Sequence, residues 1–224
     1  MEFLQNCLFI NLDHRTDRLM NVHTQMEKMG INGERFNAIK TKDGAVGCSM
    51  SHIKCLEIAK ERNWEHVFIC EDDILFTNKE LFVDSITKFN DNIKDWDVLL
   101  VSGNNAPPYK EVSEYCIKIQ NCRTTTGYVV KKHYYDKLLA NFREGLQGLI
   151  REPENKQQYA IDMYWNRIQR YDKWFLIIPL SVVQLEGYSD VENRNVDYKH
   201  LMMDLEKKWL IEQYYKKLIR DSHK

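Results

Sequence analysis

The chain has 224 residues, enough for one domain with a substantial buried core. It contains 43% hydrophobic and 29% charged residues and no apolar run near the ~20 residues of a membrane span, which excludes a disordered chain and a membrane-spanning protein. Because 32 Lys and Arg nearly cancel 33 Asp and Glu, the net charge of -1 gives no general attraction to nucleic acid, and no nucleic-acid partner is expected.

The first half of the chain alternates short apolar runs with amphipathic segments. The predicted strands are 7–11, 35–39, 67–70 and 96–101, and the predicted helices are 16–29, 49 or 51 to 62, and 79–89. Gly30 is expected to end the first helix, and the glycine-containing stretch 43–47 is expected to be a loop. This alternation predicts an α/β fold in which a mostly parallel sheet is covered by helices on both faces.

The pattern changes in the second half. Strands at 115–120 and 126–131 are predicted to pair, and further elements follow: helices at 134–142, 160–169 and 201–219, and strands at 174–178 and 181–185. We predict one domain over 1–224, with a nucleotide-binding half at about 1–105, an acceptor-facing half at about 106–200 and a C-terminal helix at 201–224. That helix is expected to pack on the sheet, although its basic and aromatic residues also suit a membrane surface or a homodimer contact.

The N-terminal stretch MEFLQNCLFINLDHR has no basic flank before its apolar run, so it predicts a strand rather than a secretion signal. The six cysteines are dispersed without a CxxC pair and are expected to be buried free thiols. Both features favour a cytoplasmic location, in a bacterial or viral setting, with no transmembrane segment.

An acidic string follows the apolar run 67–70. Glu71, Asp72 and Asp73 are adjacent where a buried strand is predicted to end, and like charges this close repel one another and raise each other's pKa values. Ligands of open α/β sheets bind beyond the carboxyl ends of the strands. A Mg²⁺ or Mn²⁺ ion that bridges one or two of these carboxylates to a diphosphate would relieve the repulsion. The ordinary alternative is a solvated acidic turn.

Two further strings contain candidate ligand-binding residues. The stretch 11–18 places two arginines beside a helix start, which suits a phosphate or a nucleoside, although a surface loop with local Arg–Asp pairs is the alternative. In the stretch 44–52, glycines and a helix start would let the backbone approach a ligand closely. It matches neither the Rossmann fingerprint nor the Walker motif, and a helix cap with a packed His52 is the alternative.

Taken together and in this order, the strings resemble glycosyltransferase family 25, which includes bacterial lipooligosaccharide galactosyltransferases and collagen galactosyltransferases. The resemblance covers about residues 7–190 and rests on six motifs: INLDHRTDR, GAVGCSMSH, ICEDDILF, TTTGYVVKK, AIDMYW and PLSVVQLEGYSD. It implies a GT-A type fold, a UDP-sugar donor, Mn²⁺ dependence and inversion at the anomeric carbon. Glu71-Asp72-Asp73 would stand in for the family's DxD motif.

The resemblance also assigns roles to residues of this sequence. Asp73 is expected to be the principal metal ligand, with Glu71, Gln184 and Asp190 as further metal or phosphate contacts. Asp162 is expected to be the catalytic base, although a lone Asp at such a place is ordinarily a helix cap. The residues expected to bind the donor are Asn11, Arg15, Arg18, Gly47, Ser49, His52, Glu71, Asp72, Thr126 and Gly127.

The predicted activity is transfer of a hexose, with galactose favoured, from a UDP-sugar to a hydroxyl group of a glycan or of hydroxylysine in a collagen-like protein. One alternative is a non-catalytic binding protein with the same fold. The other is a phosphatase of the haloacid dehalogenase type, which Glu71 disfavours because that class needs an aspartate nucleophile at the first position.

Overall fold

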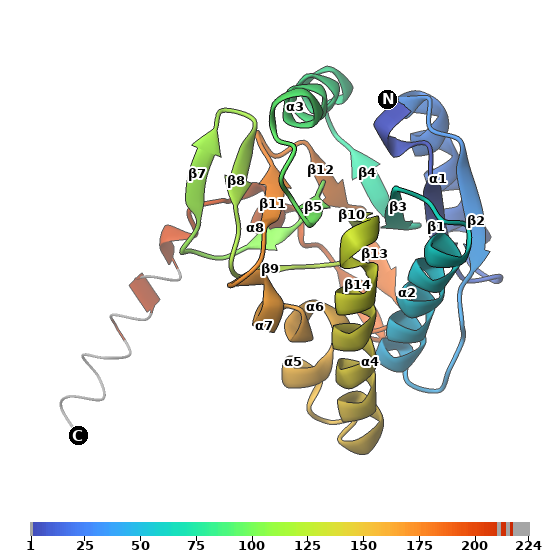
Figure 1. Cartoon of the computed structure of the whole chain (residues 1–224). Coiled ribbons are helices and arrows are strands. Elements are labelled where there is room, and N and C mark those ends of the chain that lie inside the picture. The colour runs from blue at the N-terminus through green and yellow to red at the C-terminus, as the bar shows by residue number, and fades with distance from the viewer. Residues whose placement is uncertain (1, 210–211, 214–215, 217–224) are drawn as a thin grey trace.

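An eight-stranded sheet runs through the centre of the molecule in the computed structural model, which describes residues 2–209, 212–213 and 216 (Figure 1). Its strands, in spatial order, are β2 (Gly33–Asn37), β1 (Cys7–Asn11), β3 (His66–Glu71), β10 (Gly127–Lys131), β5 (Val98–Leu100), β11 (Trp174–Ile177), β8 (Cys116–Lys118) and β7 (Lys110–Ser113). Strands β10 and β8 run opposite to the other six. The prediction of a mostly parallel sheet is confirmed.

Two helices cover each face of this sheet. Alternate residues of β1 show why: Leu8 packs in a core with α2 (Gly44–Glu61) and α4 (Tyr135–Arg151), whereas Phe9 packs in a second core with α1 (Thr16–Met29) and α3 (Lys79–Asn92). Strands that are buried on both sides are apolar along most of their length, and β1 is buried throughout and apolar up to Asn11 at its end. The predicted α/β class with helices on both faces is therefore confirmed.

The first helix forms as predicted. Its apolar residues Val22, Met26 and Met29 are buried, and Gly30 ends it in a left-handed conformation with a φ of 65°. The Gly30 N–H donates to the carbonyl groups of the last turn, which is the usual C-terminal cap.

The predicted loop at 43–47 is wrong, because helix α2 already begins at Gly44. The Asp43 side chain accepts a hydrogen bond from the Ala45 N–H and caps the helix. Gly47 allows the helix to lie against the preceding segment, since a Cβ there would come within 2.4 Å of the Ile39 carbonyl oxygen. Glycine therefore permits close packing here rather than a loop.

The predicted pairing of 115–120 with 126–131 is also wrong. Strand β10 lies between β3 and β5, and β8 lies between β11 and β7. Residues 127–130 are all buried, as a central strand requires, whereas most of β7 is exposed, as suits an edge.

Shorter elements complete the fold. They are η1 (Glu2–Leu4), η2 (Lys132–Tyr134), α5 (Lys156–Tyr159), α6 (Ile161–Tyr164), α7 (Asn166–Gln169), α8 (Lys199–Met203) and the strand pairs β12 (Val182–Gln184) with β4 (Ile74–Phe76), β13 (Gly187–Ser189) with β14 (Arg194–Val196), and β6 (Asn104–Asn105) with β9 (Cys122–Arg123). The helix predicted at 160–169 is thus divided, and α4 extends to Arg151 instead of ending at 142.

The predicted C-terminal helix at 201–219 is interrupted, because residues 204–207 are not helical. Helix α8 ends at Met203, and most of the stretch from 210 onward, with the homodimer contact predicted for it, lies outside the described residues. Among the described helices, none is long and apolar enough to cross a membrane.

Candidate active site

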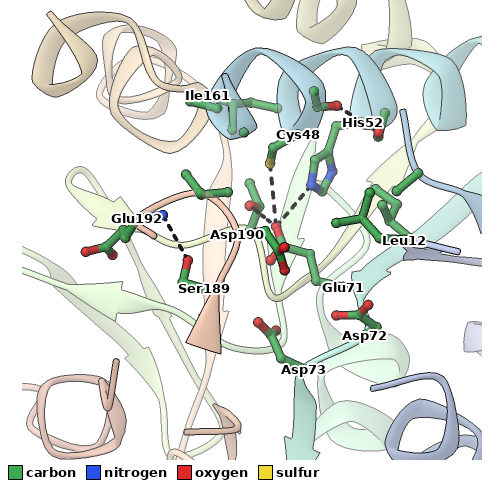
Figure 2. A pocket seen from close by; sticks show the side chains of 18 of the residues that line it. Leu12, Cys48, His52, Glu71, Asp72, Asp73, Ile161, Ser189, Asp190 and Glu192 are labelled. Carbon is green, nitrogen blue, oxygen red and sulfur yellow. Dashed lines mark hydrogen bonds and ion pairs between the residues drawn. The ribbon is translucent and has the colours of Figure 1, made fainter. Parts of the chain in front are cut away.

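A cavity of about 410 Å³ opens at the carboxyl ends of β1 and β3, where ligands of open α/β sheets bind (Figure 2). The first turn of α1, the start of α2, the β3–β4 turn, the segment 124–126, α6 and the β13–β14 hairpin all contribute to its wall. It brings together most of the predicted site residues: Arg15, Arg18, Gly47, His52, Glu71, Asp72, Asp73, Thr126, Asp162, Gln184 and Asp190.

Asp73 is the most deeply buried acid of the cavity, with 2% of its surface exposed. Its Oδ2 accepts hydrogen bonds from Arg18 Nη1 at 2.6 Å and from Gln184 Nε2 at 2.9 Å. Its Oδ1 is buried and has no hydrogen-bond partner among the described residues. Burial and the nearby charge of Glu71 raise the pKa of Asp73 to about 7. The negative charge of Asp73 is therefore only partly balanced, because its donors contact one of the two carboxylate oxygens.

Asp72 is held by two donors. Its Oδ2 accepts from Asn11 Nδ2 at 2.7 Å and its Oδ1 from Arg18 Nη1 at 3.3 Å, while burial raises its pKa. Asn11 itself is buried and does not line the described cavity; it positions Asp72 from the end of β1.

Glu71 is directed toward His52 on α2 (Figure 2). Its Oε1 lies 2.5 Å from Thr125 Oγ1 and 3.2 Å from His52 Nε2. Burial alone would raise the pKa of Glu71, but the contacts with His52 and Thr125 outweigh it and lower the pKa below its ordinary value. Glu71 therefore stays ionised at the cavity wall.

The acidic end of the cavity fits a hard divalent cation. Asp72 and Asp73 share the single guanidinium of Arg18, and Asp73 Oδ1 is an oxygen atom without a partner in the described part of the chain. Mg²⁺ and Mn²⁺ prefer such oxygen ligands. Asp73 is the residue best placed to hold the ion, whereas Gln184 donates to Asp73 itself.

The β13–β14 hairpin closes one side of the cavity and was not predicted. Arg15 Nη1 donates to Asp190 Oδ2 at 2.6 Å and to the Tyr188 carbonyl at 3.1 Å, and Arg18 Nη2 donates to the same carbonyl at 2.8 Å. Gly44 permits this approach, because a Cβ there would lie 2.5 Å from the Asp190 carbonyl oxygen. Asp190 thus contacts Arg15, and the Tyr188 carbonyl contacts both of the arginines that were predicted to bind phosphate.

Asp162 lies in α6 on another wall of the cavity. Its Oδ2 accepts a hydrogen bond from the Thr124 N–H at 3.1 Å, and Thr124 has a φ of 72°, which a β-branched residue rarely adopts. Burial, and then the charge of Glu71, raise the pKa of Asp162. Such strain at a polar wall is typical of functional sites.

Besides Asn11, two more predicted donor-binding residues, Ser49 and Gly127, do not reach the described cavity. Ser49 donates its hydroxyl hydrogen to the Ala45 carbonyl within α2. Gly127 makes room for packing, because a Cβ there would lie 2.8 Å from Val101 Cγ2.

Cys48 lines the cavity beside His52, although it was predicted only as a buried free thiol preceding the helix. The spacing of four between Cys48 and His52 would have placed both on one helix face if the start of α2 at Gly44 had been recognised. The other cysteines are free and buried, as predicted.

Several comparisons with known proteins bear on this site. The family model of glycosyltransferase family 25, described as an LPS biosynthesis protein, matches residues 42–165, more than half of the chain. No curated protein matches the sequence.

Solved structures similar to the chain include a glycosyltransferase involved in glycosylation of the major capsid of PBCV-1, at 13% identity and a TM-score of 0.44, covering 88% of this chain and 100% of that one. Another is a mannose-1-phosphate geranyltransferase from Thermus thermophilus, at 9% identity and a TM-score of 0.41. That match covers 80% of this chain, which spans only 58% of the Thermus chain. A third is a Drosophila galactosyltransferase mutant in complex with manganese, UDP-Gal and xylobiose, at 9% identity and a TM-score of 0.36, covering 59% of this chain and 50% of that one.

The family match includes the start of α2, the acidic turn and Asp162, so it spans part of the wall of the cavity just described, but not the first turn of α1 or the β13–β14 hairpin. The mixed sheet with helices on both faces agrees with the GT-A type of fold that the motifs imply. The chain belongs to glycosyltransferase family 25 and is an enzyme of the glycosyltransferase class.

Proposed function

We propose that this enzyme transfers a hexose, with galactose favoured, from a UDP-sugar to a hydroxyl group of a glycan or of hydroxylysine in a collagen-like protein. The transfer inverts the anomeric carbon and depends on Mn²⁺ or Mg²⁺. One observation carries the proposal: the buried Asp73, with one unpaired oxygen among the described residues, lines the same cavity as Arg15, Arg18 and Asp162.

The donor diphosphate would bind at the acidic end of the cavity. Arg15 and Arg18 extend from the start of α1, and guanidinium groups suit the paired oxygens of a phosphate. Asp73 would hold the metal ion, which when bound acts as a Lewis acid toward the leaving diphosphate. Arg15 would then give up part of its contact with Asp190 and contact the phosphate instead, because the carboxylate and the phosphate are both anions.

The acceptor hydroxyl would bind near Asp162. A base works best when its pKa lies near the working pH, and the raised pKa of Asp162 moves this carboxylate in that direction. The buried hydroxyl groups of Thr124 and Thr126 have no partner within the described part of the chain, so they can orient oxygens of the transferred sugar. Asp162 would take the acceptor proton while the diphosphate leaves from the opposite face.

A UDP-release screen tests this proposal. The purified protein is incubated with UDP-galactose, UDP-glucose or UDP-N-acetylglucosamine and Mn²⁺, first without acceptor and then with a panel of glycans and hydroxylysine peptides. Release that needs both Mn²⁺ and one preferred UDP-sugar supports the proposal. Failure to release UDP from any donor, with every acceptor, contradicts it.

A further inference from the structure

Cys48, His52 and Glu71 converge on one wall of the cavity, apart from the contacts of Asp73 (Figure 2). Glu71 Oε1 lies 3.2 Å from His52 Nε2 and 3.9 Å from Cys48 Sγ. All three ligand atoms lie within 4.8 Å of one another. A thiol, an imidazole and a carboxylate thus face a common point.

The fold fixes each member of this cluster. Cys48 and His52 are four residues apart on α2 and lie on the same helix face, below which β3 ends at Glu71. Thr125 holds the Glu71 carboxylate. The three side chains are therefore brought together by the helix, the end of the strand and the 124–126 segment.

The second ring nitrogen of His52 has a hydrogen-bond partner, as is usual for histidines in metal sites. Its Nδ1 lies 2.8 Å from the Tyr128 hydroxyl, which is buried with it. Without an ion, Nε2 carries a proton toward Glu71; to bind an ion, the ring would keep its proton on Nδ1 and donate it to this hydroxyl, which leaves a lone pair on Nε2. Metal-binding histidines are usually oriented by such a hydrogen bond from the second nitrogen.

The spacing suits a tetrahedral ion. Zinc bonds of about 2.3 Å to sulfur and about 2.0 Å to nitrogen and oxygen place neighbouring ligand atoms about 3.3–3.6 Å apart. The distances from Glu71 Oε1 to His52 Nε2, 3.2 Å, and to Cys48 Sγ, 3.9 Å, are close to this range. All three residues line the cavity, so a fourth ligand can approach from it.

We propose that Cys48, His52 and Glu71 bind a zinc-type ion (Zn²⁺, Co²⁺ or Cd²⁺) at a site separate from the acid Asp73. Sulfur and nitrogen ligands select such ions, whereas Mn²⁺ and Mg²⁺ prefer an all-oxygen set. The proposal does not depend on the identity of the sugar donor. Because the cluster lines the same cavity, an ion bound there would also occupy space next to the donor and lower turnover.

Titration of the metal-free protein with Co²⁺ alone tests the site through its absorption spectrum. We expect a cobalt–thiolate charge-transfer band and the intense visible bands of a four-coordinate ion, both removed by one equivalent of Zn²⁺. Cys48→Ser should lose the charge-transfer band. Cys116→Ser, a cysteine of β8 that does not line the described cavity, should keep it.

Asp73→Asn separates the two sites, since it should leave the cobalt–thiolate band intact. The proposal is overturned if the unmodified protein shows no thiolate band, or if Cys48→Ser retains the full band. Loss of the band in Asp73→Asn, with the fold retained by circular dichroism, would overturn the separation of the two sites.

Discussion

Arg18 Nη1 lies 2.6 Å from Asp73 Oδ2 and so joins the first turn of α1 to the turn between β3 and β4. The same nitrogen reaches Asp72 Oδ1 at 3.3 Å. One guanidinium therefore partly neutralises two buried carboxylates, and the second oxygen of Asp73 is left without a partner among the described residues. A divalent ion would balance the negative charge that remains on these carboxylates. The same ion would bind the phosphates of a donor.

Replacement of Asp73 by alanine should abolish metal-dependent transfer. Without this carboxylate, the developing charge on the leaving phosphate loses a stabilising interaction, and we expect kcat to fall by ~10²–10³-fold. The measurement is UDP release at saturating Mn²⁺. The matched control is Asp91→Ala at an exposed acid near the end of α3, which should retain normal activity. Normal turnover in Asp73→Ala would rule out its role as metal ligand.

The raised pKa of Asp73 predicts that the free energy of unfolding depends on pH. Its pKa is raised from 3.8 to about 7 in the fold, so the native state binds this proton more tightly than the unfolded chain does. Ionisation of Asp73 then lowers the free energy of unfolding as the pH rises from about 4 to 7. In EDTA, Asp73→Asn should melt several degrees above the unmodified protein at pH 8, and the gap should narrow toward pH 5. A gap that is independent of pH would contradict the raised pKa.

Replacement of Asp162 by asparagine should slow the transfer without weakening donor binding. The amide can still accept the Thr124 N–H but cannot take a proton from the acceptor, so kcat should fall by ~10²–10⁴-fold. Calorimetric titration with UDP and Mn²⁺ should give an unchanged affinity. Weakened UDP binding with normal turnover would instead make Asp162 a structural residue.

The approach of the β13–β14 hairpin to α2 can be tested at Gly44. A methyl group there would collide with the backbone at Asp190 and Val191, so Gly44→Ala should displace the hairpin and raise KM for the donor by about tenfold, with a smaller effect on kcat. Gly30→Ala is the control. Its φ of 65° makes alanine strained, but no described atom lies within 4 Å of the added methyl group. It should lower stability and leave KM unchanged; an equal rise in KM for both variants would show a general loss of stability instead.

Most strands of the central sheet and the first helix could be predicted because their signals are local. Val22, Met26 and Met29 follow the helical period, and Gly30 ends it, so the bounds of α1 agree with the expectation. The start of α2 could not be predicted in the same way, because Gly44 and Gly47 usually indicate loops. Here they serve tertiary packing against Asp190 and Ile39, which no local pattern reveals.

The sequence predicted which residues form the candidate site better than it predicted how their side chains are directed. The acidic string after β3 correctly indicated the end of the sheet that lines the cavity, since charged residues rarely follow an apolar run inside a core. The opposite directions of Glu71 and Asp73 depend on His52, Thr125 and Arg18, which are far away in the sequence. Such long-range contacts also explain why the hairpin over Arg15 was missed.

The central claim is that Asp73 and a divalent ion together bind the donor diphosphate, and UDP titration measured by calorimetry tests it most directly. We expect UDP to bind the unmodified protein in Mn²⁺, to bind at least tenfold more weakly in EDTA, and to show no difference between Mn²⁺ and EDTA in Asp73→Asn. Equal affinity of the unmodified protein for UDP with and without the ion would contradict the account.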